Sequence, residues 1–165
     1  MAPKKSKIFK DSEIVVILDN LRSTFNVGAI FRTSDALNVK KIYLCGITPT
    51  PKNPKIQKTA LGAEKTVSWE KVKQCSRLFK KLKKDGFYLI AIEQDKKSKN
   101  ILTLKKLQKR KIALILGSEV KGLSRKILNQ VDLILEIPMW GTKESLNIAV
   151  AFGISGYLIK KLLLF

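Results

Sequence analysis

Three segments of the chain combine polar side chains with glycines at spacings that could support chemistry. In the first, residues 20–32, Gly28 and Arg32 lie four positions apart and therefore share one face of a predicted helix. An arginine one turn above a glycine can fold down onto a ligand, and Asn26 at the start of the helix can cap it or bind. A capped helix with a surface arginine would give the same pattern.

The second segment is Gly117-Ser-Glu-Val-Lys-Gly122, in which two glycines stand five residues apart. The spacing is similar to that of a phosphate-binding loop, but Leu123 and Ser124 occupy the places where such a loop requires Lys and then Ser or Thr. We therefore exclude a phosphate-binding loop. What remains is a glycine-flanked loop with one carboxylate, Glu119, which can offer backbone groups to a close ligand or serve as a plain strand-to-helix turn.

The third segment, residues 137–147, leads into the last predicted helix. Ser145 can cap that helix and Asn147 falls in its first turn, so polar side chains and free backbone N–H groups converge there. Capping and core packing alone would also explain the pattern. Behind these residues, a stripe of small residues lets another backbone approach closely: Ala149, Gly153 and Gly156.

Several kinds of site are excluded by what the sequence lacks. Histidine is absent, which removes the usual zinc sites, His-dependent triads and imidazole acid–base catalysis, and we expect no metal site. No GxGxxG follows the first predicted strand, so a Rossmann dinucleotide site is excluded. Cys45 and Cys75 lie in apolar stretches and form no CxxC pair, so we expect them to pack as small hydrophobic residues.

The three segments belong to an alternating pattern of strands and helices. Continuous apolar runs predict strands at 13–19, 41–46, 87–92, 112–116 and 133–137, with a shorter one at 66–69. Apolar residues at helical spacing predict helices at 26–37, 70–84, 102–107, 123–129 and 146–164, and residues 47–54 are predicted to be a loop. The order predicts one α/β domain, residues 13–165, with a mainly parallel sheet and helices on both faces. A flexible basic arm, residues 1–12, would precede it. Such sheets bind ligands at the carboxyl ends of their strands, where all three segments are expected.

The charge of the chain is strongly unbalanced: 33 Lys and Arg against 13 Asp and Glu give a formal net charge of +20. Such a charge predicts a polyanionic partner, because basic residues that neutralise phosphates release counterions. A solvated basic surface is the alternative. Lysine outnumbers arginine, which favours attraction to a nucleic-acid backbone over bidentate reading of bases. Fifteen of the 33 basic residues lie in residues 71–84 and 96–111, outside the three segments.

The sequence shows no signal for export or membrane insertion. No apolar stretch follows the basic N-terminus, unlike in a secretory signal. The longest apolar run, residues 146–159, is too short for a comfortable membrane span and predicts a buried helix. We expect a soluble protein of the cytoplasm, without a membrane partner.

Taken in order, the three segments resemble the SpoU (TrmH-type) branch of the SPOUT RNA methyltransferases. The resemblance covers roughly residues 13–163 and rests on Asn26-x5-Arg32, on Leu116-Gly117-x-Glu119-x2-Gly122-Leu123, and on Ile137-Pro-Met139 followed by Ser145-Leu146-Asn147. Two shorter matches agree with it, Arg32-Thr-Ser-Asp-Ala36 and Leu61-Gly-Ala-Glu64. Two positions depart from it: Val120 stands where the family often has glycine, and Ala149 where serine is common.

The resemblance implies a parallel α/β sheet with a deep trefoil knot near the C-terminus. It also implies a homodimer formed through the region of the last helix. The implied reaction is methyl transfer from S-adenosylmethionine to a ribose 2′-hydroxyl of tRNA or rRNA. The cofactor would bind in the knot, and the implied cofactor-binding residues are Leu116, Gly117, Glu119, Gly122, Ile137, Met139, Ser145 and Leu146.

By the same resemblance, Arg32 is the catalytic arginine, with Asn26, Glu119, Ser145 and Asn147 around it. The family proposal makes this arginine the base that takes the proton of the 2′-hydroxyl. Because arginine scarcely deprotonates in proteins, we favour a role in binding the adjacent phosphate and stabilising the developing alkoxide. A cofactor that carries the reactive group also explains how a chain without histidine can be an enzyme.

The candidate RNA contacts are basic residues: Arg22, Arg32, Lys71, Lys80, Lys84, Lys96 and Lys97. Two alternatives to an RNA methyltransferase stay open. One is a non-catalytic RNA-binding protein that keeps the SPOUT fold, and the retained polar residues of the three segments argue against it. The other is a small-molecule or nucleotide-binding α/β protein whose basic surface is incidental.

Overall fold

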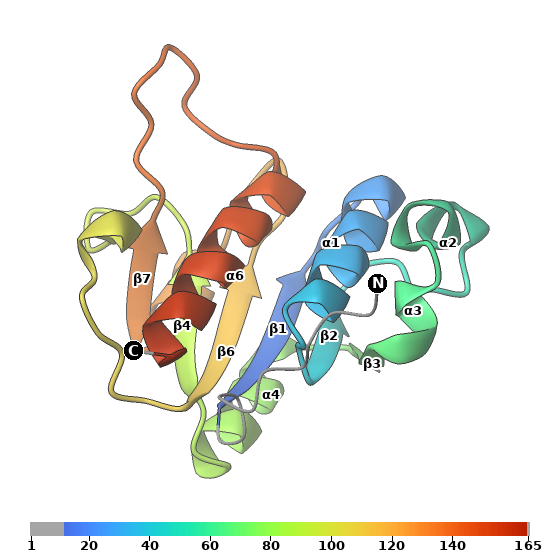
Figure 1. Ribbon diagram of the computed structural model, residues 1–165, viewed down its shortest axis with the longest axis horizontal. Helices are drawn as coiled ribbons and strands as arrows, with labels where there is room; N and C mark the ends of the chain where they lie inside the picture. The colour runs from blue at the N-terminus through green and yellow to red at the C-terminus, as the bar shows by residue number, and fades with distance from the viewer. Residues whose placement is uncertain (1–11, 165) are drawn as a thin grey trace.

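The computed structural model describes residues 12–164, which build one sheet of seven strands with every pairing parallel (Figure 1). This confirms the predicted α/β class. The predicted arm, residues 1–12, lies outside the described residues except for its last position. From one edge of the sheet to the other, the strands are β3 (Ser68–Val72), β2 (Lys41–Cys45), β1 (Glu13–Asp19), β6 (Lys111–Leu116), β4 (Tyr88–Ile92), β7 (Leu133–Glu136) and β5 (Lys99–Asn100).

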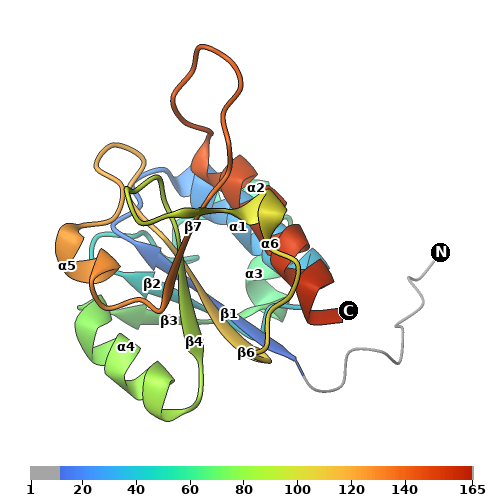
Figure 2. The same ribbon diagram turned by 90° about the vertical axis from the view of Figure 1, so that its left-hand side faces the viewer.

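Helices cover both faces of the sheet (Figures 1 and 2). One face carries α1 (Thr24–Ala36), α2 (Pro54–Ala60), α3 (Ala63–Thr66), the 3₁₀ helix η2 (Ile101–Thr103) and α6 (Ile148–Leu164). The opposite face carries α4 (Cys75–Lys84) and α5 (Arg125–Leu128). Val16 of β1 packs in the first core and Val15 in the second, so alternate side chains of one strand serve both. Burial on both faces explains why the strands are continuous apolar runs.

The boundary between β3 and α4 differs from the prediction. The short strand expected at 66–69 runs instead over Ser68–Val72, and the helix expected at 70–84 begins only at Cys75. The apolar spacing predicted one long helix because Val72 and Phe79 pack in the same core. Val72, however, does so from the strand and Phe79 from the helix. The helix expected at 102–107 is a single 3₁₀ turn, Ile101–Thr103.

The segment between β2 and β3 contains two helices that the sequence pattern did not reveal, α2 and α3. Pro54 stands in the first turn of α2 and the side chain of Asn53 caps it, so residues typical of a loop here start a helix. Helix α2 packs closely on α1 at Gly28, where an added Cβ would overlap Thr59 and lie 2.6 Å from the carbonyl oxygen of Ile56. Gly28 is therefore needed for the packing of α2 on α1.

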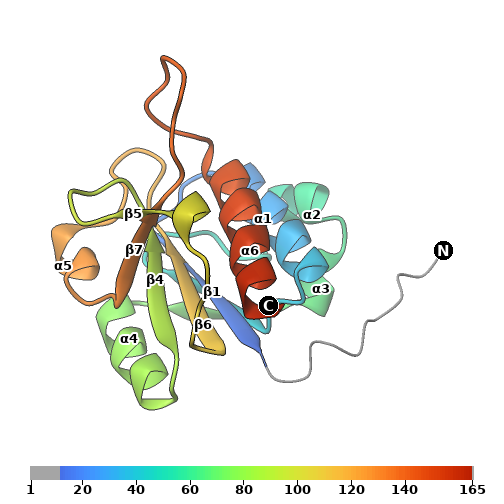
Figure 3. The same ribbon diagram turned by 60° about the vertical axis from the view of Figure 1, so that its left-hand side comes forward.

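The order of the strands decides where ligand-binding loops can meet. Strands β6, β4 and β7 are neighbours, so their carboxyl ends lie side by side at one edge of the sheet. The long loop from β7 to α6 projects beyond this edge (Figure 3). None of the helices within residues 12–164 is long and apolar enough to cross a membrane.

Candidate functional site

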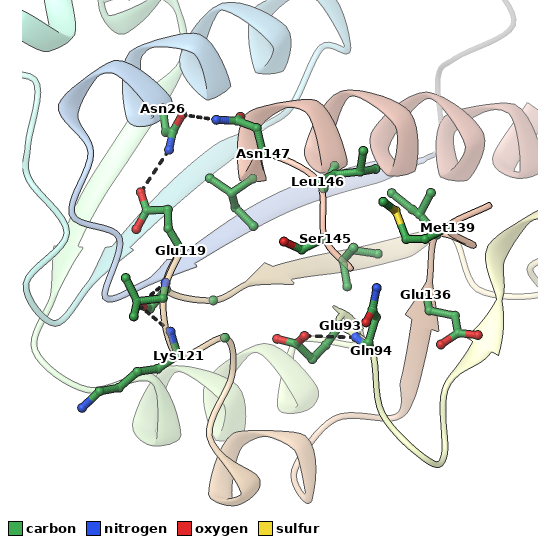
Figure 4. A pocket seen from close by; sticks show the side chains of 18 residues that line it. Asn26, Glu93, Gln94, Glu119, Lys121, Glu136, Met139, Ser145, Leu146 and Asn147 are labelled. Carbon is green, nitrogen blue, oxygen red and sulfur yellow. Dashed lines mark hydrogen bonds between the residues drawn. The ribbon is translucent and has the colours of Figure 1, made fainter. Parts of the chain in front are cut away.

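A pocket of about 610 Å³ opens at the carboxyl ends of β4, β6 and β7 (Figure 4). This volume lies within the range of roughly 300–1,000 Å³ that is usual for small-molecule and cofactor sites. All three segments singled out in the sequence contribute to its walls, together with the end of β4. The lining residues are Asn26, Ile92, Glu93, Gln94, Gly117, Ser118, Glu119, Val120, Lys121, Gly122, Glu136, Ile137, Met139, Ser145, Leu146, Asn147, Ile148 and Ala151.

The carboxylate of Glu119 joins the second segment to the first. One of its oxygens accepts a hydrogen bond from the backbone N–H of Arg22 at 3.0 Å. The other accepts from the backbone N–H of Ser23 and from the side-chain amide of Asn26, both at 3.1 Å. Burial alone would raise the pKa of the Glu119 carboxyl, but these donors outweigh burial and hold the pKa below its ordinary value of 4.5. Glu119 is therefore an anion that positions the loops, and it is a poor proton acceptor.

Asn26 and Asn147 join the first segment to the third. The side-chain amide of Asn147 donates to the Asn26 side-chain oxygen at 3.0 Å. The Asn147 oxygen accepts from the backbone N–H groups of Ala149 at 2.9 Å and Val150 at 3.4 Å. Asn147 thus caps α6, the role expected of Ser145, because the helix begins at Ile148, two residues later than predicted. Ser145 lies in the loop and lines the pocket.

The two glycines of the second segment allow its loop to close on itself. A Cβ at Gly117 would lie 2.5 Å from the carbonyl carbon of Gly122, so only glycine permits this approach. Gly122 has a φ of +62°, a conformation that favours glycine, and its N–H donates to the Ser118 carbonyl oxygen at 2.8 Å. The loop that holds Glu119 in place is therefore a narrow turn.

Three polar residues of the pocket were missed in the sequence: Glu93, Gln94 and Glu136. A Glu93 oxygen accepts from the backbone N–H of Leu123 at 2.9 Å, and a Glu136 oxygen accepts from the Ser98 hydroxyl at 2.6 Å. The Gln94 amide donates to the backbone of the β7–α6 loop, at Glu144, over 2.6 Å. Each of the three stands at or just after the end of a strand, the one signal that could have identified them.

Of the predicted catalytic and cofactor-binding residues, two lie outside the pocket lining. Leu116 is fully buried in β6, and its side chain belongs to the core beneath the pocket. Arg32 is exposed on α1, six residues beyond Asn26 and therefore about 9 Å further along the helix. The other predicted residues line the pocket: Asn26, Glu119, Ser145, Asn147, Gly117, Gly122, Ile137, Met139 and Leu146.

The basic residues expected to bind RNA are spread over different parts of the surface. Arg22 is exposed beside Glu119, and Lys96 and Lys97 follow the pocket residue Gln94 in the β4–β5 loop. Lys80 and Lys84 lie in the second half of α4, which runs toward the amino-terminal edge of the sheet, away from the pocket (Figure 2).

Among the predicted RNA contacts, Lys71 differs because its ammonium group donates hydrogen bonds to the protein itself. It donates to the backbone carbonyl oxygens of Gly46, at 2.6 Å, and Thr48. Burial lowers the pKa of Lys71. These contacts hold the loop after β2, so Lys71 has a structural role besides any contact with RNA.

No group of three or more His, Cys, Asp or Glu residues within residues 12–164 is arranged to hold a metal ion. The polar groups that the pocket offers are backbone groups, carboxylates and amides, next to apolar side chains of Ile92, Ile137, Met139 and Leu146. This mixture suits an organic ligand that has both an apolar and a polar part.

Comparison with known proteins agrees with the geometry. The profile of the SpoU rRNA methylase family matches residues 13–157. A 23S rRNA (guanosine-2′-O-)-methyltransferase of Coxiella burnetii is 31% identical over 151 residues, which are 90% of this chain and 58% of the relative. A tRNA (guanosine(18)-2′-O)-methyltransferase of Aquifex aeolicus is 32% identical over 149 residues, 90% of this chain and 69% of the relative.

Solved structures show the same fold. The AdoMet-bound rRNA methyltransferase of Sinorhizobium meliloti superimposes with a TM-score of 0.83 at 25% identity, over 93% of this chain and 57% of that one. The chain thus spans only part of the length of several relatives. The match of the family profile over most of the chain shows that the protein belongs to the SpoU rRNA methylase family.

Proposed function

We propose that this protein is an S-adenosylmethionine-dependent methyltransferase that methylates a ribose 2′-hydroxyl in structured RNA, either tRNA or rRNA, in the cytoplasm. The observation that carries the proposal is the hydrogen-bonded chain from Glu119 through Asn26 to Asn147. It brings three segments that are far apart in sequence to one pocket. The relatives named as ribose 2′-O-methyltransferases and the AdoMet-bound neighbour support the same chemistry.

The pocket residues fit the proposed cofactor. Backbone groups of Gly117, Ile137 and Leu146 would hold it, with Glu119, Gly122, Met139 and Ser145 beside them. When bound, S-adenosylmethionine supplies a methyl group activated by a positively charged sulfur. The protein contributes a pocket and hydrogen-bonding groups that orient the ligand. Its catalytic contribution would therefore be mainly positioning.

Arg32 would act on the RNA rather than on the cofactor. Arginine is in general a poor base in proteins, so we favour an electrostatic role for Arg32 over removal of the hydroxyl proton. From its exposed place on α1 it can bind the phosphate next to the target ribose and stabilise the oxygen as negative charge develops on it. Glu119 is also unsuited to be the base, because three donors occupy its oxygens.

We also propose that the protein is a homodimer formed through α6. Val150, Ile154 and Tyr157 are 50%, 37% and 56% exposed, and their spacing places them on one face of the helix. An exposed apolar stripe on a helix whose other side packs in the core, here through Phe152 and Ile159, is typical of an interface. Sedimentation analysis of the purified protein tests the proposal: we expect a dimer at micromolar concentration, and a monomer there would refute it.

A knotted chain is part of the same proposal. Strands β4 and β5 follow each other in sequence, yet β7 lies between them in the sheet. The chain from β4 through β5 and η2 to β6 therefore loops around the place of β7. In the proposed knot, the segment that leaves β7 would pass through this loop on its way to α6, and the contacts of α6 with η2, β4 and β6 support that path. An experimental chain trace without that crossing would refute the knot.

Replacing Arg32 tests the proposed chemistry. We expect Arg32→Ala to lower methyl transfer to RNA by about 10²–10³-fold, the usual effect of removing a group that stabilises a developing oxyanion. Binding of S-adenosylmethionine should be unchanged, because Arg32 lies outside the pocket lining. Tritiated methyl transfer and calorimetry measure the two effects, with Lys126→Ala on α5, an exposed basic residue outside both basic stretches, as the matched control. Undiminished transfer by Arg32→Ala would contradict the assignment.

Charge reversal tests the basic surface. We expect the double change Lys96→Glu and Lys97→Glu to weaken RNA binding and to reduce the salt slope of log K by about 1 per lost phosphate contact. Lys80→Glu with Lys84→Glu should act in the same way, since the two basic stretches together would hold one RNA. Cofactor affinity should stay constant in both variants. If the variants bind RNA as tightly as the unmodified protein at every salt concentration, these lysines form only a solvated surface.

A further inference from the structure

A carboxylate that lines the pocket lies at the end of each of three neighbouring strands or within three residues after it. Glu119 follows β6, Glu93 directly follows β4, and Glu136 is the last residue of β7 (Figure 4). Since β6, β4 and β7 lie side by side, these three acids surround one cavity. Thus the pocket of a strongly basic chain is lined by three acidic residues and one basic residue, Lys121.

None of these three carboxylates is paired with a cation among residues 12–164. Their hydrogen-bond donors are uncharged: backbone N–H groups, the Ser98 hydroxyl and the Asn26 amide. Lys121 extends away from the other labelled side chains in Figure 4. The ion pairs of the described residues use other acids: Glu13, Glu70, Asp95 and Asp132.

A shortage of basic side chains cannot explain this, because the chain has 33 of them. Unpaired carboxylates in a concave site create a negative potential, which attracts a cation and repels phosphate groups. The outer surface has the opposite sign. The two fields would therefore direct a cationic ligand into the pocket and keep an RNA backbone outside it.

We propose that Glu93 and Glu136 make the pocket select the positively charged methyl donor over its neutral product. This inference rests on the proposed function. S-adenosylmethionine has a net charge of +1, from its sulfonium, ammonium and carboxylate groups. In the transfer, the carbon–sulfur bond would break as the methyl group passes to the ribose oxygen, the sulfur would keep the bonding electron pair and become neutral, and the hydroxyl proton would be released to water. The reaction thereby removes the charge that the pocket holds, which favours exchange of S-adenosylhomocysteine for fresh cofactor.

Glu93→Gln and Glu136→Gln test the proposal, because glutamine keeps the size of the side chain and an oxygen that can accept from Leu123 N–H or Ser98 O–H. In calorimetric titrations of the full chain, we expect each variant to bind S-adenosylmethionine about tenfold more weakly. Binding of S-adenosylhomocysteine should change less than about twofold, since a neutral ligand gains little from the field. Glu70→Gln, on the edge strand β3, removes the same charge far from the pocket and should change neither affinity.

A salt series on the unmodified protein gives a second measurement. The affinity for S-adenosylmethionine should fall with sodium chloride while that for S-adenosylhomocysteine stays nearly constant, because salt screens the interaction between charges. Equal weakening of both ligands in the glutamine variants would overturn the proposal and show that the two acids bind the parts that the ligands share. No weakening would overturn it as well. Failure of the unmodified protein to bind either ligand would instead refute the proposed function, and the inference with it.

Discussion

The hydrogen bonds of the Glu119 carboxylate are the constraint on which the candidate site depends. They reach across almost a hundred positions of the chain to Arg22, Ser23 and Asn26, and Asn26 continues the contact to Asn147. Neutral donors to a carboxylate form charge-assisted bonds that are stronger than those between two neutral groups. One anion joins the loops after β1 and β6, and Asn147 adds the loop before α6, so these hydrogen bonds position the pocket walls relative to one another.

Charge gives this small domain a second level of organisation. The exterior is strongly basic, whereas the three acids at the ends of β6, β4 and β7 face the pocket. A methyltransferase that acts on RNA must bind a cationic methyl donor and a polyanion at adjacent sites, and neither ligand should enter the site of the other. If the proposed function holds, opposite fields on the surface and in the pocket would provide that separation. The absence of histidine is compatible with such an enzyme, since its chemistry depends on position and field rather than on an imidazole.

Much of the fold could be predicted from the sequence because the parallel strands are buried on both faces. The predicted bounds of β1 agree with the structure, since a run of apolar β-branched residues leaves little alternative. The second segment also lies where it was expected, at the carboxyl end of β6. Helix α2 was missed because Asn53, its N-cap, and Pro54, its first residue, are equally common in loops. Only the packing of this segment against Gly28 distinguishes a helix from a loop here.

The site was predictable where its residues form ordered motifs and unpredictable where they do not. Asn26, Glu119 and Asn147 were identified, and the structure brings them into contact. Glu93 and Glu136 are isolated acids whose meaning appears only when the strand order makes them neighbours. The cap of α6 was assigned to Ser145 instead of Asn147 because both side chains can cap, and a shift of two residues in the helix start decides between them.

Amide hydrogen exchange at Arg22 and Ser23 is the most direct test of the role of Glu119. Both N–H groups lie in a loop, and their described acceptor is the Glu119 carboxylate. In Glu119→Ala we predict that these two amides exchange at least about tenfold faster. Local opening of this loop would cost less free energy in the variant, because it would no longer break the hydrogen bonds to the carboxylate. Amides in the centre of β1 should keep their protection. Unchanged exchange at Arg22 and Ser23 would contradict the claim that this carboxylate holds the site together.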